Sequence, residues 1–214
     1  MSNVTVVVPT LNRPDFVGRL LRYYAAVGFT GHVQLGDSST PEKAQRIQAI
    51  VKEVSDKVTV RYLSCPELND SQTIRALLER TETPYVAFVA DDDFIIPYGM
   101  QRCAEFLDGH PDYSVAHGKA CLFELKQSGA HGEMAGTGEY RLPGIVADTG
   151  SERLLRHIER YGTTLFSLHR TEQFRRGYRN IDRLPDKAFT ELLPVCHSAI
   201  QGKGILPIAA RGAT

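Results

Sequence analysis

The sequence predicts an α/β fold of three layers, in which helices cover both faces of a mostly parallel central sheet. Two observations favour it. Short runs of β-branched residues, such as Val4 to Val8, alternate with longer stretches of helical periodicity, such as Phe16 to Ala26. The segments between them are rich in turn-forming proline, glycine and asparagine. Alternation of this kind joins parallel strands through right-handed crossovers.

Strands are expected at residues 4–8, 33–35, 58–63 and 85–90, and each ends in a polar loop. The loops are residues 10–13, 37–39, 65–69 and the acidic triplet at 91–93. Because the carboxyl ends of parallel strands meet at one edge of a sheet, we expect these loops to lie along a single rim.

Helices are expected between these strands. Thr40 and Pro41 are typical of an N-cap and first helical position, for a helix that runs to Val54. Asp70 or Ser71 caps the next helix, which ends near Arg80. The second half has a weaker pattern, with helices at 97–107, 154–161 and 188–202, strands within 113–125 and 163–169, and a weakly ordered glycine-rich stretch at 127–138.

Composition excludes several classes of protein. The 25 basic residues balance 25 acidic ones, so no overall field attracts nucleic acid. The four cysteines are too scattered for a zinc ribbon or a disulfide framework, which indicates reduced thiols. No stretch approaches the ~20 apolar residues of a membrane span. We therefore expect a cytoplasmic protein and leave peripheral attachment to a membrane open.

The aspartates Asp91, Asp92 and Asp93 are the most informative feature of the chain. They follow a buried strand, so three carboxylates stand side by side at its carboxyl end. Like charges this close repel one another unless a cation or solvent compensates them. An acidic triplet alone is more often a solvated turn than a metal site, and its setting after a buried strand favours the metal site.

Three motifs together resemble a known family. They are VVVPTLNR at residues 6–13, GDSST at 36–40 and YVAFVADDDFIIP at 85–97. In this order they are similar to the inverting nucleotide-sugar glycosyltransferases of family two, with a DXD-like motif in the acidic triplet. The resemblance implies the GT-A-like fold of nucleotide-diphospho-sugar transferases, a three-layer αβα sandwich. It implies one domain over residues 1–214, with a nucleotide-binding half, 1–110, and an acceptor-side half, 111–214.

The resemblance assigns the first loop to the nucleotide. The residues implied are Pro9, Thr10, Asn12 and Arg13, although ordinary turn residues explain the local sequence equally well. In the family an aromatic residue usually stacks on the base at the position of Leu11, so the choice of base stays open.

Further nucleotide contacts are implied for Asp37, Arg75 and Asp91. Asp37 matches a carboxylate that accepts a hydrogen bond from the pyrimidine ring, but the acidic residue that usually precedes it is Gly36 here. A turn or capping role is the alternative for Asp37. Asp91 is expected toward the ribose and Arg75 toward the phosphates. An ion pair between Arg75 and Glu79, one helical turn away, is the alternative that the local sequence favours.

The metal assigned by the resemblance is Mn²⁺ or Mg²⁺, bridging the phosphates of the donor. Asp92 matches the most direct ligand, and Asp93 is a second ligand or a neighbour of it. A ligand set made only of oxygen atoms suits these hard cations.

An inverting transfer also needs a base that takes the proton of the acceptor hydroxyl, and the candidates are Glu191 and Asp186. Glu191 stands beside Leu192 and Leu193, where partial burial would raise its pKa. With Gly202 and Lys203 it resembles the corresponding helix of the family. Asp186 follows Pro185 and has helix capping as its alternative role. We place Glu191 first and Asp186 second.

Other polar residues fit structural roles better. His169 and Arg170 end an expected strand, where a lone histidine is more often structural than catalytic. The arginines at 170, 175, 176, 179 and 183 are interspersed with Glu172 and Asp182, which favours a solvated face. Many family members have a basic C-terminal segment over the pyrophosphate, and we expect it to be short or missing after Arg211.

The sequence thus predicts a metal-dependent, inverting glycosyltransferase that moves a sugar from a nucleotide-sugar donor to a hydroxyl of a glycan, lipid or protein. One alternative is a sugar nucleotidyltransferase, although the first loop lacks a glycine-rich phosphate signature. The other is a catalytically inert GT-A-like module that binds a nucleotide or a partner. No nucleic-acid partner is expected, and a homodimer is left open.

Overall fold

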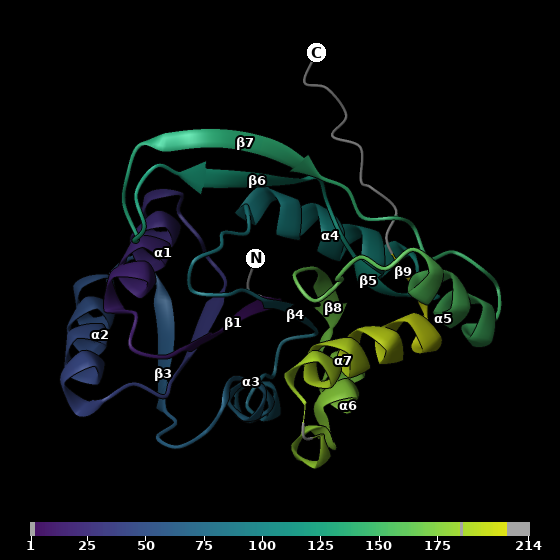
Figure 1. The fold of residues 1–214 in the computed structure, drawn as a ribbon, viewed down its shortest axis with the longest axis horizontal. Coiled ribbons are helices and arrows are strands. Elements are labelled where there is room, and N and C mark those ends of the chain that lie inside the picture. Colours follow the sequence, from purple (N-terminus) through teal and green to yellow (C-terminus); the bar gives the residue numbers. More distant parts are fainter. Residues whose placement is uncertain (1–2, 185, 205–214) are drawn as a thin grey trace.

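The computed structural model describes residues 3–184 and 186–204. At its centre is a seven-stranded sheet of order β3-β2-β1-β4-β8-β5-β9, with helices on both faces (Figure 1). The strands β3, β2, β1 and β4 are parallel neighbours, while β8 runs antiparallel to β4 and β5. The predicted α/β fold with a mostly parallel central sheet is confirmed.

The strands of this sheet are β1 (Val4–Thr10), β2 (His32–Asp37), β3 (Thr59–Ser64), β4 (Tyr85–Phe88), β5 (Tyr113–Ala116), β8 (Leu168–Arg170) and β9 (Lys203–Gly204). A separate antiparallel pair is formed by β6 (Ala120–Leu125) and β7 (Met134–Tyr140).

The helices are α1 (Pro14–Ala26), α2 (Pro41–Glu53), α3 (Asp70–Glu79), α4 (Pro97–Gly109), α5 (Gly150–Glu159), α6 (Thr171–Tyr178) and α7 (Lys187–Gln201), with a 3₁₀ turn, η1, at Ile181–Arg183. No helix among the described residues is long and apolar enough to cross a membrane.

Two hydrophobic clusters hold the layers together. Val4, Val6 and Val8 of β1 pack in a cluster with residues of α1, α2 and α4, whereas Val7 packs in a second cluster with residues of α3, α6 and α7. This division follows from the alternation of side chains along a strand. Full burial of one such side chain contributes about 1.5–3 kcal/mol, so β1 anchors both layers.

The predicted rim is confirmed by the strand register. Thr10 lies beside Asp37, and Asp37 lies beside Ser64, so β1, β2 and β3 end at the same level. The start of α3 differs in detail from the prediction. Asn69, rather than Asp70 or Ser71, is the N-cap, because its side chain and that of Gln72 form a reciprocal capping box.

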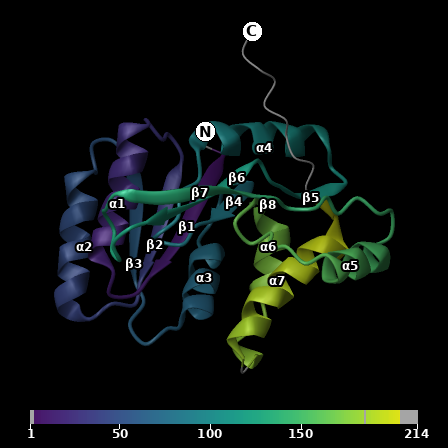
Figure 2. The same ribbon diagram turned by 45° about the horizontal axis from the view of Figure 1, so that its top comes forward.

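The glycine-rich stretch is where the prediction was wrong. Its end belongs to β7, which pairs with β6 in a hairpin that extends over α1 (Figures 1 and 2). Two glycines give β7 a low intrinsic strand propensity, and the ladder with β6 decides its conformation instead. The sequence prediction also missed α6, whose segment is polar, and placed β8 over a longer range than it has.

Candidate functional site

The first and third motifs meet at a buried carboxylate. Asp91 is 4% exposed and accepts a hydrogen bond of 2.6 Å from the hydroxyl of Thr10. The guanidinium of Arg13 lies 2.6 Å from its other oxygen. Burial raises the pKa of Asp91, while the Thr10 hydrogen bond and the Arg13 charge oppose that rise. The structure therefore holds Asp91 through both carboxylate oxygens.

Arg13 also contacts the next aspartate. Its second nitrogen donates to the Asp92 carboxylate at 2.9 Å, and its guanidinium lies 3.9 Å from the centre of the Phe16 ring. The side chains of Arg13 and Asp92 are 38% and 45% exposed, so this pair is open to solvent, unlike the contact with Asp91. Part of the negative charge of the triplet is thus compensated within the chain.

Arg19 is a site residue that sequence reasoning missed. It donates to the backbone oxygens of Asp92 at 2.6 Å and Ala130 at 2.8 Å, so it joins α1 to the triplet and to the turn between β6 and β7. Burial, the leading influence, lowers its pKa. No sequence pattern marks it, because both partners are carbonyl groups of segments that only the tertiary fold brings near.

The second loop is centred on Asp37, which is 2% exposed. Its carboxylate accepts hydrogen bonds from the Ser39 amide at 2.9 Å and the Tyr62 hydroxyl at 2.8 Å. Asp37 therefore has the turn role that was given as its alternative to nucleotide binding. Its contact with Tyr62 could not be read from the sequence. At Gly36 a Cβ atom would meet the Thr73 methyl group at 2.4 Å. Packing against α3 therefore explains why an acidic residue is absent there.

Asn12 ties the first loop to the second. It has a positive φ of 59°, a conformation that asparagine tolerates better than most residues. Its amide donates to the Ser39 hydroxyl at 2.7 Å, and its side-chain oxygen accepts from the Thr40 amide at 2.9 Å. Pro9 lies within β1 beside Gly36, and Leu11 is 58% exposed at the tip of the loop.

Asp93 completes the triplet. Its side chain is exposed and makes no hydrogen bond or ion pair with the described residues. Desolvation, the leading influence, raises the pKa of Asp93, and repulsion from Asp92 adds to that rise. Asp92 and Asp93 thus differ from Asp91 in being accessible.

The accessible pair, Asp92 and Asp93, supplies only part of a metal site. Within residues 3–184 and 186–204, no group of three or more His, Cys, Asp or Glu side chains is arranged to hold a metal ion. Two accessible carboxylates nevertheless fit a hard cation, because Mg²⁺ commonly takes one or two carboxylates from a protein and its other ligands from substrate phosphates and water.

The two candidate bases lie on α7, apart from the triplet. Asp186 is its N-cap and accepts a hydrogen bond from the Ala188 amide at 2.7 Å, which is the capping role given as its alternative. Glu191 is exposed, so its expected partial burial is wrong. Helix α7 buries the face that carries Pro194 and Val195 instead. No hydrogen bond or ion pair among the described residues joins Glu191 or Asp186 to the triplet.

Arg75 is engaged with acidic neighbours. It forms an ion pair with Asp182 of η1 and lies 3.6 Å from Glu79, the partner expected from the local sequence. The ion pair with Glu79, which was the alternative role of Arg75, is thus present in the structure. The Arg75 guanidinium pairs with one carboxylate of α3 and one of η1.

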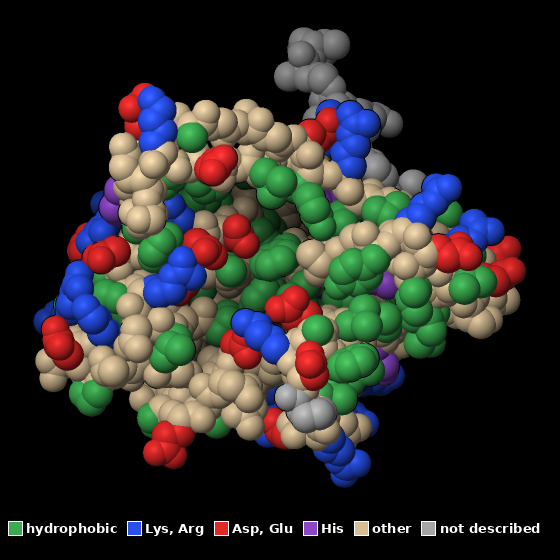
Figure 3. Space-filling view, in the orientation of Figure 1, with side chains coloured by type: hydrophobic (Ala, Val, Ile, Leu, Met, Phe, Trp, Pro, Cys, Tyr) green, Lys and Arg blue, Asp and Glu red, His purple; other side chains and the backbone are tan. Residues whose placement is uncertain are grey.

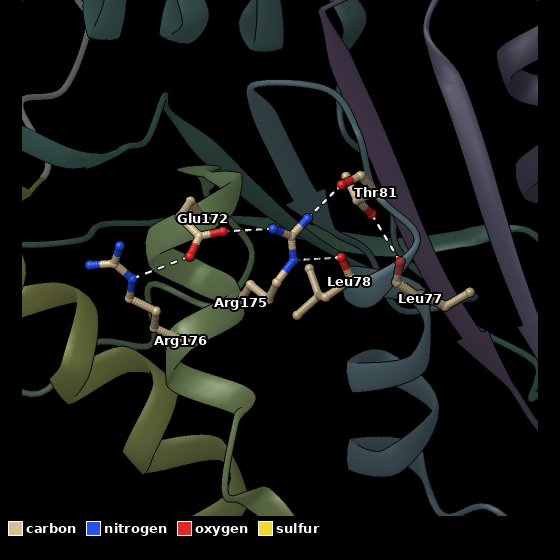
Figure 4. A network of polar contacts seen from close by, with 6 residues as sticks. All are labelled: Leu77, Leu78, Thr81, Glu172, Arg175 and Arg176. Carbon is tan, nitrogen blue, oxygen red and sulfur yellow. Dashed lines mark hydrogen bonds and ion pairs between the residues drawn. The ribbon is translucent and has the colours of Figure 1, made fainter.

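Arg175 of α6 joins that helix to the end of α3. Arg175 donates to the backbone oxygens of Leu78 at 2.9 Å and Thr81 at 2.5 Å, at the end of α3 (Figure 4). Glu172 pairs with Arg175 and with Arg176, one turn later on α6. Carbonyl groups at a helix end lack intrahelical partners, and Arg175 satisfies them.

Three further basic residues of the second half of the chain, Arg170, His169 and Lys203, have structural contacts as well. Arg170 donates to the backbone oxygen of Tyr113 at 2.8 Å. His169 is 1% exposed and stacks on Phe174, and burial lowers its pKa to about 4. Lys203 pairs with Asp112 at 3.2 Å. Arg211 lies outside the described residues.

A cavity adjoins the accessible aspartates. It has a volume of ≈ 330 Å³, is open to solvent, and is bordered on one side by α1 and the triplet and on the other by β6 and the turn after it. Its lining residues are Phe16, Arg19, Asp92, Asp93, Cys121, Leu122, Phe123, Glu124, Leu125, Gln127 and Gly129. The surface of this face is hollowed near its centre, where hydrophobic side chains form the floor and charged side chains lie along the margin (Figure 3).

The sheet order and the convergence of three motifs at its carboxyl edge define the class of fold, a GT-A-like nucleotide-diphospho-sugar transferase fold. The chain is similar to the crystal structure of S. aureus TarS 1–349, with 20% identity and a TM-score of 0.67 over 95% of this chain and 58% of that one. A longer S. aureus TarS structure is 22% identical, with a TM-score of 0.64, over 97% of this chain and 36% of that one.

Complexes of TarS 1–349 with UDP and with UDP-GlcNAc each match with 20% identity and a TM-score of 0.59, over 95% of this chain and 57% and 56% of theirs. The chain therefore spans little more than half of TarS 1–349. No protein-family model and no curated protein matches it. At the level of the fold, the resemblance to the GT-A glycosyltransferases of family two is confirmed.

Proposed function

We propose that this protein transfers a sugar from a nucleoside diphosphate donor to an acceptor hydroxyl. The observation that carries the proposal is the junction of Thr10, Arg13 and Asp91 beside two accessible carboxylates, at the carboxyl edge of the sheet. Ligands of open α/β sheets bind at this edge. The UDP and UDP-GlcNAc complexes of TarS support a uridine donor.

The nucleoside is bound by the first two loops. Pro9, Thr10 and Asn12 shape the wall beside the base and ribose, with Asp91 toward the ribose. Asp37 accepts a hydrogen bond from the ring, for which its carboxylate oxygens retain lone pairs beyond those used by Ser39 and Tyr62. Arg75 is not assigned to the phosphates, because its guanidinium already pairs with Glu79 and Asp182.

The phosphates lie beside Asp92 and Asp93, which would hold Mn²⁺ or Mg²⁺. The cation, when bound, neutralises the charge that develops on the leaving diphosphate. Arg13 adds a guanidinium that donates to phosphate oxygens once it leaves the exposed Asp92 carboxylate.

Inversion at the anomeric carbon requires a base on the acceptor side, and Glu191 remains the first choice, with Asp186 the second. Glu191 is exposed and therefore accessible to an acceptor, whereas Asp186 is engaged by the Ala188 amide. A carboxylate in either place takes the hydroxyl proton as the new glycosidic bond forms.

Binding of nucleotides tests the site. We would titrate the protein with the diphosphates of uridine, guanosine, thymidine and cytidine, with and without Mn²⁺, and compare Asp92→Ala with Asp56→Ala, a control at an exposed aspartate. We expect binding of UDP that depends on Mn²⁺ and is lost only in Asp92→Ala. Equal binding by all three proteins would overturn the proposal.

Donor hydrolysis tests the base. Turnover of a UDP-sugar by Glu191→Gln is expected to fall at least a hundredfold, since general-base catalysis contributes 10²–10⁴, and Asp186→Asn serves as the comparison. Unchanged turnover in both variants would reject both assignments.

A sugar nucleotidyltransferase is the second candidate. CMP:2-keto-3-deoxy-manno-octonic acid synthetase complexed with CTP is 13% identical, with a TM-score of 0.50, and the match covers 95% of this chain and 89% of that one. Release of pyrophosphate from a nucleoside triphosphate and a free sugar, without release of a nucleoside diphosphate, would favour this candidate.

A further inference from the structure

The cavity beside the triplet lies between two walls that come from different halves of the chain. One wall is the β6–β7 hairpin, which comes from the second half of the chain and extends over α1 (Figures 1 and 2). The opposite wall carries Phe16, Arg19, Asp92 and Asp93. The cavity therefore borders the two carboxylates proposed to meet the phosphates.

Aromatic and aliphatic groups face the interior. The ring of Phe123 lies 6.1 Å from that of Phe94, which in turn packs edge-on against Tyr23 at 5.0 Å. Residues 121–125 of β6 all line the cavity, and the ladder with β7 is irregular between Glu124 and Leu125. Glu124 is exposed and is one of the lining residues, so its carboxylate adds negative charge to the cavity.

The charged residues that line the cavity are Asp92, Asp93, Glu124 and Arg19. The guanidinium of Arg19 is engaged by two backbone oxygens and lies between the rings of Phe16 and Phe94, at 5.2 and 4.9 Å. Three carboxylates, against the guanidinium groups of Arg19 and of Arg13, which pairs with Asp92, leave the lining negative. A nucleoside diphosphate that arrives with a divalent cation does not reverse this sign, because it carries at least as much charge as the cation.

We propose that this cavity binds a sugar ring of a glycan acceptor that is uncharged or bears an amine, and that it excludes anionic glycans. This inference rests on the proposed function and names the class of acceptor. A pyranose ring offers an apolar C–H face to Phe123, and its hydroxyl or ammonium groups donate hydrogen bonds to Glu124, which is not one of the residues proposed to hold the cation. A phosphate or carboxylate on the ring meets repulsion instead.

Alkylation of Cys121 can test directly whether a ligand occupies the cavity. It is exposed and lines the cavity, whereas Cys65 and Cys103 are buried and Cys196 is half-buried. In a Cys196→Ser background, the rate at which iodoacetamide alkylates Cys121 reports occupancy. The probes are a neutral cello-oligosaccharide, a deacetylated chitosan oligosaccharide and an oligogalacturonate of equal length.

We expect the neutral and amine-bearing probes to slow alkylation at least fivefold at saturation and the anionic probe to leave it unchanged. Phe123→Ala should remove this protection, while Met134→Ala, on β7 and outside the lining, should retain it. Absence of protection by every probe, or equal protection by the anionic one, would overturn the inference.

UDP binding, measured on the same samples, separates this inference from the proposed function. UDP binding without protection of Cys121 overturns the acceptor cavity alone. Protection without UDP binding overturns the proposed function and leaves the cavity as a glycan site.

Discussion

The hydroxyl of Thr10 donates a hydrogen bond of 2.6 Å to the carboxylate of Asp91, across the parallel strands β1 and β4. Both residues are buried, so the bond forms where competition from water is weak. It fixes the first loop relative to the acidic triplet before any ligand binds.

Replacement of Thr10 by valine should destabilise the protein by about 1–3 kcal/mol, because a buried carboxylate loses a donor while the volume is kept. Urea unfolding measures the change, and Thr10→Ser is the matched control that keeps the hydroxyl. Equal losses in the two variants would show that the methyl group, rather than the hydrogen bond, matters.

Removal of Arg13 should strengthen Mn²⁺ binding in the absence of nucleotide. Arg13 competes for the exposed Asp92 carboxylate, and a partly exposed ion pair is worth up to about 1 kcal/mol, so Arg13→Gln should tighten binding by up to roughly fivefold. Electron paramagnetic resonance of free Mn²⁺ gives the affinity, with Arg22→Gln, which breaks a surface pair with Glu53, as the control. Weaker or unchanged affinity would contradict competition at Asp92.

Gly36→Ala should destabilise the fold by about 1–3 kcal/mol, through crowding of a closely packed contact between β2 and α3. The added Cβ meets the Thr73 methyl group at 2.4 Å, whereas at Gly99 it meets nothing within 4 Å. Gly99→Ala is therefore the control in thermal unfolding. A double variant, Gly36→Ala with Thr73→Ser, should recover part of the loss, and failure to do so would place the strain elsewhere.

Acid should weaken the fold through two buried histidines. Burial lowers the pKa of His117 and of His169 to about 4, against 6.5 for the unfolded chain. Each histidine stabilises the fold fully above pH 6.5, and this contribution of about 3 kcal/mol is lost as the pH falls toward 4. Asp91 and Asp93, whose pKa values are raised, act with the opposite sign near the acidic end of that range.

Unfolding by urea between pH 7 and pH 5 tests this expectation. The stability of His117→Gln should depend less steeply on pH than that of the parent, while His131→Gln, at an exposed position, should follow the parent. Identical slopes in all three proteins would exclude His117 from the pH dependence.

The alternation of apolar strands and amphipathic helices was enough to predict the layers, the parallel half of the sheet and the common edge of its loops. These features depend on local periodicity, which can be recognised from consecutive residues alone. The helix boundaries at Pro41 and Pro97 could be expected for the same reason, because proline at the first turn acts locally, whereas α1 begins at Pro14, two residues before the expected start at Phe16.

Contacts between distant segments decided the rest. Arg19 reaches carbonyl groups of Asp92 and Ala130, and Tyr62 reaches Asp37, and no local pattern encodes either contact. The strand β7 forms despite its glycines because β6 provides the hydrogen-bond ladder. The exposure of Glu191 depends on which face α7 buries against the sheet and α6. Tertiary packing, rather than the neighbouring residues in the sequence, determines that face. Thus residue types and order determined the fold and the acidic triplet, while tertiary packing decided which carboxylates are paired and which are left accessible.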